Sequence, residues 1–190
     1  MFHPTQMSAK DTGLLVIDVQ EKLTVKIPRA AEMIRNIGFL ADAAKLLNMP
    51  VQATEQYPRG LGGTVRELAQ RFPERPDKVA FSCCAIPKVV ETFRTAARPK
   101  ILLTGIEAHV CVLHTALDLL ALDFRVFVAV DAVASRFELD REVALQRLQR
   151  AGCILVTTEM SLFEWVGGAD HPNFKAISAL VQERSKAMNQ

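Results

Sequence analysis

The sequence predicts an α/β protein, built as a three-layer, doubly wound sheet of six mainly parallel strands in the order 3-2-1-4-5-6. Short apolar runs, each of strand length, alternate along the chain with longer stretches of helical periodicity. No internal repeat or low-complexity linker interrupts this alternation. With right-handed crossovers, the alternation produces one parallel sheet with helices on both faces.

The composition indicates one globular domain over residues 1–190. At 49% hydrophobic residues, the chain is large enough to bury one core. Charged residues make up 23% and the formal net charge is +2, which argues against a disordered or nucleic-acid-coating protein. No apolar segment is long enough to span a bilayer and residues 1–10 do not resemble a signal peptide, so we expect a soluble, cytoplasmic protein with no membrane partner. The four cysteines match neither a disulfide framework nor a zinc site, so we expect reduced thiols.

The first part of the chain predicts two central strands and a binding loop. Residues 13–18 form a continuous apolar run that ends in Asp18, the pattern of a strand buried on both faces. Helical spacing follows over residues 28–48, and residues 50–54 form a second short strand. The glycine-rich loop over residues 55–63 then lies at the same sheet edge as Asp18, where doubly wound folds bind ligands.

The remaining elements continue the alternation. The other expected strands cover residues 78–82, 100–104, 125–130 (leading into Asp131) and 153–157. The other expected helices cover residues 64–71 (with Thr64 as N-cap), 87–97, 138–150 and 172–188, with one more beginning at Cys111. Phe163 and Trp165, which follow the last expected strand, are expected to pack against the body of the protein or at a subunit contact.

The predicted strand order brings two chemically interesting residues together. The first and fourth strands are neighbours at the point where the winding reverses. Asp18 ends the first strand, and the fourth leads through Gly105 to Cys111 at the start of a helix. A thiol in the first turn of a helix faces unpaired N–H groups and the positive end of the helix dipole, which favours thiolate over thiol. The sequence therefore predicts Cys111 as a nucleophile and Asp18 as its proton acceptor.

A cation is the expected third member of this group. Lys78, at the start of the third strand, is the candidate, because an ammonium beside a carboxylate and a thiol stabilises both anions. The residues alone leave the ordinary alternatives open. Lys78 could be a surface lysine, Asp18 a strand-end carboxylate that caps a loop, and Cys111 a buried structural thiol.

Four segments of the chain resemble those of one known family. They are residues 15–20 (LVIDVQ), 78–82 (KVAFS), 104–111 (TGIEAHVC) and 130–135 (VDAVAS). On these segments the chain is similar to the isochorismatase-like cysteine hydrolases, over nearly its whole length. The resemblance implies the family's Rossmann-type fold and a catalytic triad of Asp18, Lys78 and Cys111. It also implies a cis peptide bond between Ile106 and Glu107, and an oxyanion hole formed by the N–H groups of Glu107 and Cys111.

Differences from two branches of that family narrow the resemblance. Nicotinamidases carry an aspartate and histidines as metal ligands after the second strand. This chain has TEQYP at residues 54–58, so the resemblance implies no bound metal and no cofactor. Isochorismatases proper lack the nucleophilic cysteine, which this chain has at Cys111. Residues 54–62 and the segment 171–175 (HPNFK) look most like the isochorismatase-domain-containing subgroup.

Further residues are assigned to the surroundings of the site. Those expected to line a substrate pocket are Gln20, Gln56, Tyr57 and Ile106. For the two glutamines, the alternative that they only satisfy the loop backbone stays open. His109 and His114 are not on one helix face, so no metal pair is expected, and Cys83 and Cys84 are expected to be packing residues.

The functional hypothesis is a metal-independent cysteine hydrolase that cleaves a C–N bond of amide, imide or carbamoyl type in a small molecule. Asp18 takes the thiol proton, Cys111 forms a covalent thioester, and Asp18 then activates water. A catalytically idle interaction module with the same fold is the alternative. A nuclease-like role is disfavoured because the sequence shows no basic stripe with aromatic residues. We expect no nucleic-acid partner, and a homo-oligomer, a dimer or larger, as is frequent in the family.

Overall fold

The computed structural model describes residues 3–188 and has a six-stranded sheet at its centre. All strand pairs are parallel and the order is β3-β2-β1-β4-β5-β6, which confirms the predicted topology. The strands are β1 (Thr12–Ile17), β2 (Val51–Gln56), β3 (Asp77–Lys78), β4 (Lys100–Ile106), β5 (Arg125–Ala134) and β6 (Ile154–Val156).

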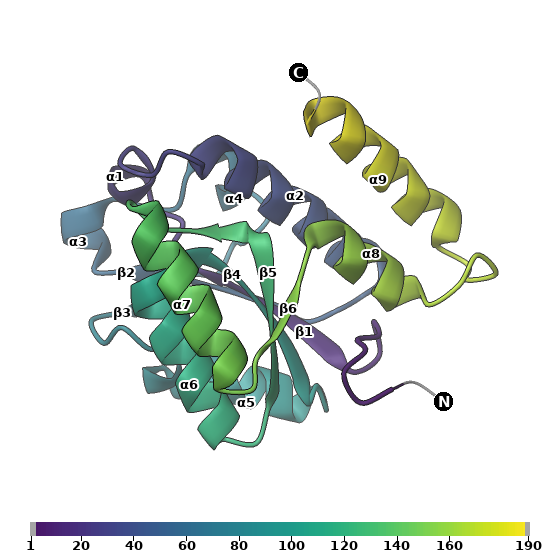
Figure 1. Ribbon diagram of the computed structural model, residues 1–190, viewed down its shortest axis with the longest axis horizontal. Helices are drawn as coiled ribbons and strands as arrows, with labels where there is room; N and C mark the ends of the chain where they lie inside the picture. Colours follow the sequence, from purple (N-terminus) through teal and green to yellow (C-terminus); the bar gives the residue numbers. More distant parts are fainter. Residues whose placement is uncertain (1–2, 189–190) are drawn as a thin grey trace.

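Helices cover both faces of this sheet (Figure 1). One face carries α2 (Ala30–Leu46), α8 (Thr158–Val166) and α9 (Phe174–Met188), and the other carries α5 (Pro87–Thr95), α6 (Leu113–Ala121) and α7 (Glu138–Arg150). The connections before and after β2 contain α1 (Glu21–Thr24), α3 (Pro58–Leu61) and α4 (Arg66–Ala69). A 3₁₀ turn lies at Cys83–Ala85 and a π-helical turn at Ala108–Val112. Among residues 3–188, no helix combines the length and apolar character that crossing a membrane requires.

Alternate residues of the central strands divide between two apolar cores. In β1, Leu14 and Val16 belong to the core under α2, whereas Leu15 and Ile17 belong to the core under α6, and all four are at most 2% exposed. This period of two is what a strand buried on both faces requires. The continuous apolar run in the sequence is therefore explained by burial from both sides.

Gly105 in β4 is required by the close approach of β1. Its φ is 108°, and a Cβ at this position would lie 2.0 Å from the carbonyl oxygen of Ile17. A side chain would have to displace the backbone of the neighbouring strand, so only glycine fits here. β1 and β4 can therefore stay paired as far as Gly105, which keeps their carboxyl ends side by side.

Two strands, β3 and β5, differ most in length from the prediction, and the other strands differ by at most two residues. The third strand was expected over residues 78–82 but consists of Asp77–Lys78. The residues that follow face solvent, with Val79 80% and Phe81 52% exposed, so a longer strand would bury no apolar side chains there. The fifth strand is longer than expected and runs through Asp131 to Ala134, because it pairs again with β4 after a shift of register.

The helices also differ from the prediction: besides the short α1 and α3, which were not predicted, three differences concern the core and the candidate site. The sequence analysis missed α8, whose Trp165 is 2% exposed and packs into the core under α2. Thr64 does not cap α4, because its N–H and Oγ1 both donate to Glu55 Oε1, and the helix begins later. Cys111 lies in the π-helical turn that precedes α6, and not in the first turn of an α-helix.

Candidate active site

The ends of β1 and β3 bring Asp18 and Lys78 together inside the protein. Lys78 Nζ lies 2.6 Å from Asp18 Oδ2, and the two side chains are 1% and 0% exposed. Asp18 follows β1 with a φ of 53°, a left-handed conformation that aspartate tolerates better than most residues. Lys78 Nζ also donates to Gln56 Oε1 at 2.7 Å and to the carbonyl oxygen of Phe81 at 3.0 Å. The ammonium group thus has an acceptor for each of its three protons.

Lys78 is held in its charged form by its surroundings. Burial by itself lowers the pKa of Lys78, but the negative charge of Asp18, with smaller contributions from Cys83 and Cys111, raises this pKa above its ordinary value. The ammonium therefore compensates the buried carboxylate of Asp18, which would otherwise be costly to hold away from water.

Cys111 lies beside this ion pair, in the π-helical turn that follows β4. It is 6% exposed, and its Sγ donates to Gln56 Oε1 over a long distance of 4.0 Å. Burial raises the pKa of the Cys111 thiol well above its ordinary value and the charge of Asp18 raises it further, whereas Lys78 lowers it only in part. The direction of this pKa shift is opposite to the expectation that helix position favours the thiolate, because burial is its largest cause. We call Asp18, Lys78, Gln56 and Cys111 the Asp18 cluster.

Two residues that the sequence analysis did not assign to the site also contact this cluster. Thr54 Oγ1 donates to Asp18 Oδ1 at 2.8 Å and lies 3.4 Å from Cys83 Sγ. Burial, followed by the charge of Asp18, raises the pKa of Cys83 to about 12, so this second thiol is also neutral. Thr54 pairs with Ile17 across β1 and β2. A threonine at the end of the second predicted strand, level with Asp18, is the sequence signal that could have revealed it.

The two glutamines have different roles. Gln20 is fully buried, its Oε1 accepts from the Gln56 N–H at 2.7 Å, and its Nε2 donates to the carbonyl oxygens of Gln56 at 2.9 Å and Gly62 at 2.7 Å. The alternative that a glutamine satisfies the loop backbone therefore applies to Gln20. Gln56 instead directs its own side chain to Lys78, while its Nε2 donates to the carbonyl oxygen of Val79 at 2.7 Å.

The other predicted pocket and oxyanion residues lie around the turn after β4 and in the loop after β2. The peptide bond between Ile106 and Glu107 is cis, and the Ile106 side chain is fully buried in the core under α2. The Glu107 carboxylate accepts from the Arg136 N–H at 2.9 Å and from its Nε at 3.1 Å. Tyr57 is 54% exposed. That Ile106, Tyr57 or the Glu107 N–H contacts a substrate stays a prediction.

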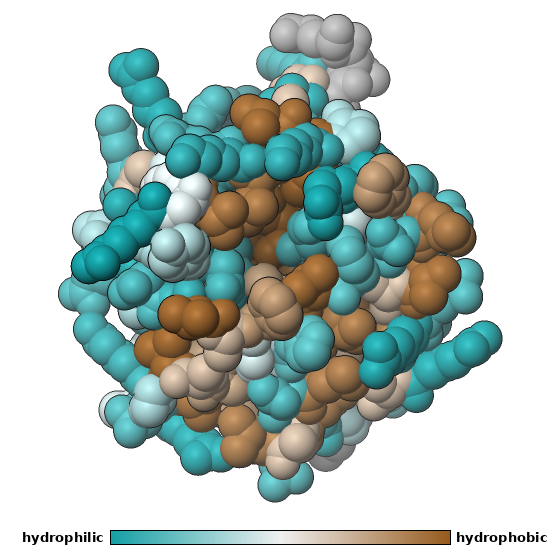
Figure 2. Space-filling model, turned by 90° about the vertical axis from the view of Figure 1, so that its left-hand side faces the viewer, coloured by the Kyte–Doolittle hydropathy of each residue, from teal (hydrophilic) through white to brown (hydrophobic). Residues whose placement is uncertain are grey.

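Exposed apolar side chains, interspersed with polar ones, lie on the side of the protein that carries α1 and α3. Figure 2 faces the side on which α1, α3 and the start of α7 lie in Figure 1, and hydrophobic residues gather across it. Exposed large apolar side chains near these helices and after β3 include Val25, Tyr57, Val79, Phe81, Phe137 and Leu139. The ring of Phe81 lies 5.8 Å from that of His114, which is three residues beyond Cys111.

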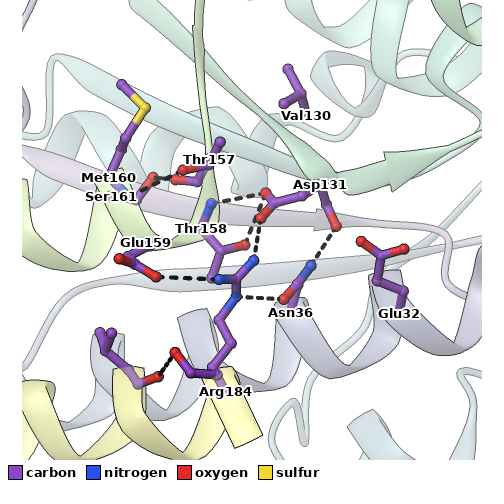
Figure 3. Close-up of polar contacts among 12 residues, drawn as sticks. Glu32, Asn36, Val130, Asp131, Thr157, Thr158, Glu159, Met160, Ser161 and Arg184 are labelled. Atoms are coloured by element: carbon purple, nitrogen blue, oxygen red, sulfur yellow. Dashed lines mark hydrogen bonds and ion pairs between the residues drawn. The ribbon is translucent and has the colours of Figure 1, made fainter. Parts of the chain in front are cut away.

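A second buried polar cluster lies on the α2 face of the sheet (Figure 3). Arg184 Nη2 lies 2.8 Å from Asp131 Oδ2, and its Nε donates to Asn36 Oδ1 at 2.8 Å. Asn36 Nδ2 donates to the Asp131 carbonyl oxygen at 2.7 Å, and Asp131 Oδ1 accepts from the N–H and Oγ1 of Thr158 at 2.8 and 3.0 Å. This Asp131 cluster (Asp131, Arg184, Asn36 and Thr158) ties β5, α2, α8 and α9 together.

Potential metal ligands are dispersed. Within the described range 3–188, no three His, Cys, Asp or Glu side chains are arranged to hold a metal ion. His109, close to Cys111 in sequence, has its Nδ1 3.0 Å from Ser135 Oγ and its Nε2 3.8 Å from Asp140 Oδ2. Its neighbours are thus a hydroxyl and one partly exposed carboxylate.

Comparisons with known proteins point to one family. The family model described as "Isochorismatase domain" matches residues 12–160, which include Asp18, Lys78 and Cys111. The secreted isochorismatase effector Isc1 of Phytophthora sojae is 39% identical over 186 residues, which cover 93% of this chain and 87% of that protein. Isochorismatase domain-containing protein 2 of Bos taurus is 41% identical over 175 residues, covering 90% and 83% of the two chains.

A solved structure agrees with these sequence matches. The MAR1 ribonuclease from Caenorhabditis elegans superimposes with a TM-score of 0.88 at 42% sequence identity, over 93% of this chain and 92% of that chain. The range matched by the family model, residues 12–160, includes all four segments that resemble the family. The chain belongs to the isochorismatase family and has the family's hydrolase fold.

Proposed function

We propose that this protein is a cysteine hydrolase that cleaves a C–N bond of amide, imide or carbamoyl type in a small molecule, through a thioester with Cys111. The Asp18 cluster is the observation that carries the proposal. A buried carboxylate, an ammonium and a thiol, contributed by three separate segments, meet at the carboxyl edge of the sheet. A thiol with a carboxylate base beside it is the combination that nucleophilic catalysis requires.

In the first half-reaction, Cys111 Sγ attacks the carbonyl carbon while Asp18 accepts the thiol proton. The raised pKa of Cys111 keeps this proton on sulfur until substrate binds, so transfer and attack occur together. The N–H groups of Glu107 and Cys111 bind the negative oxygen of the tetrahedral intermediate. The C–N bond then breaks, Asp18 gives its proton to the leaving nitrogen, and the thioester remains.

In the second half-reaction, water gives a proton to Asp18 and attacks the thioester carbon. The C–S bond breaks, the acid product leaves, and the proton returns from Asp18 to sulfur. Lys78, whose pKa is raised, stays protonated throughout and stabilises the carboxylate each time it re-forms. All proton transfers are assigned to Asp18, and no step is assigned to a metal.

An activity screen over small amides, imides and carbamoyl compounds tests the proposal. Cys111→Ala is the test variant, and Cys153→Ala is the matched control, because Cys153 is 4% exposed and packs in the core under α6. We expect kcat/KM to fall at least about a thousandfold in Cys111→Ala and to stay within about twofold in Cys153→Ala. Mass spectrometry of protein quenched during turnover should find the acyl group on Cys111. Full activity of Cys111→Ala would contradict the proposal.

The names of two similar proteins supply the alternative substrates. RNA is assayed because of the MAR1 ribonuclease, and isochorismate because of the effector Isc1. Turnover of either compound that survives Cys111→Ala would replace the proposed reaction, because it would not pass through a thioester. If no compound acylates Cys111, the catalytically idle interaction module is favoured.

The proposal includes a cytoplasmic location and a homo-oligomer, a dimer or larger. Light scattering after size exclusion measures the mass of the particle against the 21.0 kDa chain. Cell fractionation measures where the protein resides. A monomer, or protein recovered outside the cell, would correct these two statements and leave the chemistry untouched.

A further inference from the structure

We propose that Gln56 is a positioning residue of the Asp18 cluster, whose amide oxygen is the shared acceptor that orients the Lys78 ammonium and the Cys111 thiol before substrate binds. The inference rests on the proposed function and deepens it. It replaces the pocket-lining role that the sequence indicated for this glutamine. Four observations of the structure support it.

The orientation of the Gln56 amide is determined by its contacts. Nε2 donates to the carbonyl oxygen of Val79 at 2.7 Å, which leaves Oε1 to accept from Lys78 Nζ at 2.7 Å and from Cys111 Sγ at 4.0 Å. An amide has one donor end and one acceptor end, so a reversed side chain would place an NH₂ group against the ammonium. The oxygen must therefore face Lys78 and the sulfur.

The backbone of Gln56 is fixed from two sides. Gln56 and Lys78 are register partners across β2 and β3, which places their side chains on the same face of the sheet. On the other side, Gln20 accepts from the N–H of Gln56 and donates to its carbonyl oxygen. Gln20 thereby replaces a neighbouring strand at the point where β2 ends. The Gln56 amide oxygen is thus held by its hydrogen bond from Lys78 and by the fixed backbone of Gln56.

The chemical effect follows from how the three Lys78 protons are used. They go to Asp18 Oδ2, Gln56 Oε1 and the Phe81 carbonyl oxygen, so none is directed at sulfur. Gln56 Oε1 also accepts from the thiol, and a lone pair facing sulfur stabilises S–H and disfavours S⁻. Gln56 therefore keeps Cys111 protonated and keeps Lys78 directed at Asp18. Proton transfer to Asp18 then waits for the substrate.

Alkylation of Cys111 by iodoacetamide tests this role without a substrate. Gln56→Met removes the acceptor at similar size, and Gln56→Glu adds a negative charge in the same place. Gln52→Glu, on the same strand, is the matched control, because the Gln52 amide donates only to the Val51 carbonyl oxygen. All variants carry Cys84→Ser, since half-buried Cys84 competes for the reagent. The rate is followed on the peptide that contains Cys111, from neutral to alkaline pH.

The two Gln56 variants should shift the thiol in opposite directions. In Gln56→Met the freed Lys78 proton can turn to sulfur, so the apparent pKa of alkylation should fall by about one unit and the rate at neutral pH should rise about tenfold. In Gln56→Glu the added charge should slow alkylation by about tenfold. Gln52→Glu should match the parent. Shifts of the same sign, or none beyond the control, would overturn the inference, because a purely structural role does not change sign with charge.

Turnover supplies the second readout. Although Gln56→Met makes the thiol more acidic, kcat should fall about tenfold with KM within about twofold, since the freed Lys78 proton turns to sulfur and the ammonium is no longer oriented toward Asp18 as in the parent. An unchanged kcat would contradict the inference, and thermal unfolding identifies any variant that fails to fold. The two proposals can fail separately. A Cys111→Ala variant with full activity removes the proposed function, whereas the alkylation shifts depend only on the contacts of Gln56.

Discussion

The Asp18 cluster and the Asp131 cluster are assembled from the same three kinds of side chain. Each combines a carboxylate with a cation and a carboxamide: Asp18, Lys78 and Gln56 in one, and Asp131, Arg184 and Asn36 in the other. Both carboxylates also accept from a threonine hydroxyl. The kinds of side chain present therefore do not by themselves identify a reactive site. Burial does distinguish the two ion pairs, since the side chains of Lys78 and Asp18 are 1% and 0% exposed, whereas those of Arg184 and Asp131 are 12% and 14% exposed.

The two clusters differ in the cation and in whether a nucleophile lies beside it. Arg184 uses its planar guanidinium to bond Asn36 of α2, Asp131 of β5 and Glu159 of α8 at the same time. These contacts join packed elements and involve no nucleophile (Figure 3). The compact ammonium of Lys78 instead has its acceptors beside Cys111, whose sulfur makes a long contact of 4.0 Å with Gln56 Oε1. We infer that the Asp131 cluster fastens α9 to the sheet, and that the Asp18 cluster carries the chemistry.

Exchanging each carboxylate for an amide should give the largest contrast. Asp18→Asn removes the proposed proton acceptor, so kcat on a confirmed substrate should fall by about a hundredfold to ten-thousandfold. Asp131→Asn should leave kcat within about twofold, because Asp131 lies outside the Asp18 cluster. Steady-state kinetics of both proteins below their unfolding temperatures measure the difference. Equal losses would show that the two clusters do not differ in function.

Removing the buried cation of the Asp18 cluster should have the next largest effect, on stability. Lys78→Met leaves the Asp18 carboxylate buried without its partner, so we expect the free energy of unfolding to fall by about 3–5 kcal/mol. The double variant Asp18→Asn, Lys78→Met should recover part of this loss, because no charge is then buried, yet stay inactive. Urea unfolding of the four proteins completes the cycle. A double variant that is less stable than Lys78→Met alone would contradict this account.

Breaking the Asp131 cluster should lower the stability of the protein and leave its activity unchanged. Arg184→Met removes three hydrogen-bond partners of a guanidinium that is 12% exposed, and we expect a loss of about 1–3 kcal/mol, or a fall in Tm of several degrees. Arg184→Lys should restore little, since an ammonium cannot bond three separated partners in one plane. Calorimetry measures Tm and the activity assay measures kcat. A large loss of kcat in Arg184→Met at permissive temperature would mean that α9 supports the active site.

Alkaline pH should affect one cluster only, and by the smallest amount. The pKa of Lys78 in the folded protein lies above its ordinary value of 10.5, so its pairing stabilises the fold fully below pH 10.5 and is lost as the pH rises through the folded-state pKa. The stability difference between the parent and Lys78→Met should therefore be constant near neutral pH and shrink above about pH 10.5. The difference for Arg184→Met should stay constant, because a guanidinium keeps its charge there. Urea unfolding at stepped pH separates the two trends.

Much of the fold could be read from the sequence because its pattern is local. Apolar runs and helical spacing gave the strands and their order, and the family resemblance added Lys78, which lies 2.6 Å from Asp18. The incorrect predictions concern features that depend on residues far apart in the sequence. β3 is short because Val79 and Phe81 face solvent. The start of α8 is stabilised by a residue far away in the sequence, since Asp131 accepts from Thr158, the first residue of the helix, and a local pattern does not reveal this contact.

The candidate site shows the same division. Asp18 and Cys111 could be named early, since an acid and a thiol that follow neighbouring parallel strands must end near each other. Thr54 and Cys83 were not assigned to it, because their role depends on which atoms face Asp18. The different roles of Gln20 and Gln56 also required the directions of their amides, which no spacing in the sequence specifies.

The sequence by itself determined all six strands, most of the longer helices, the order of the strands and therefore the edge at which Asp18 and Cys111 meet. Only the tertiary structure decided that burial raises the pKa of the Cys111 thiol, that a π-helical turn carries this residue, and that Gln56 Oε1 contacts both Cys111 and Lys78. The physical reason is the distance along the chain over which the determining interactions act. Secondary structure and strand order follow from local patterns and chain connectivity, whereas desolvation and hydrogen-bond direction depend on everything that packs around an atom.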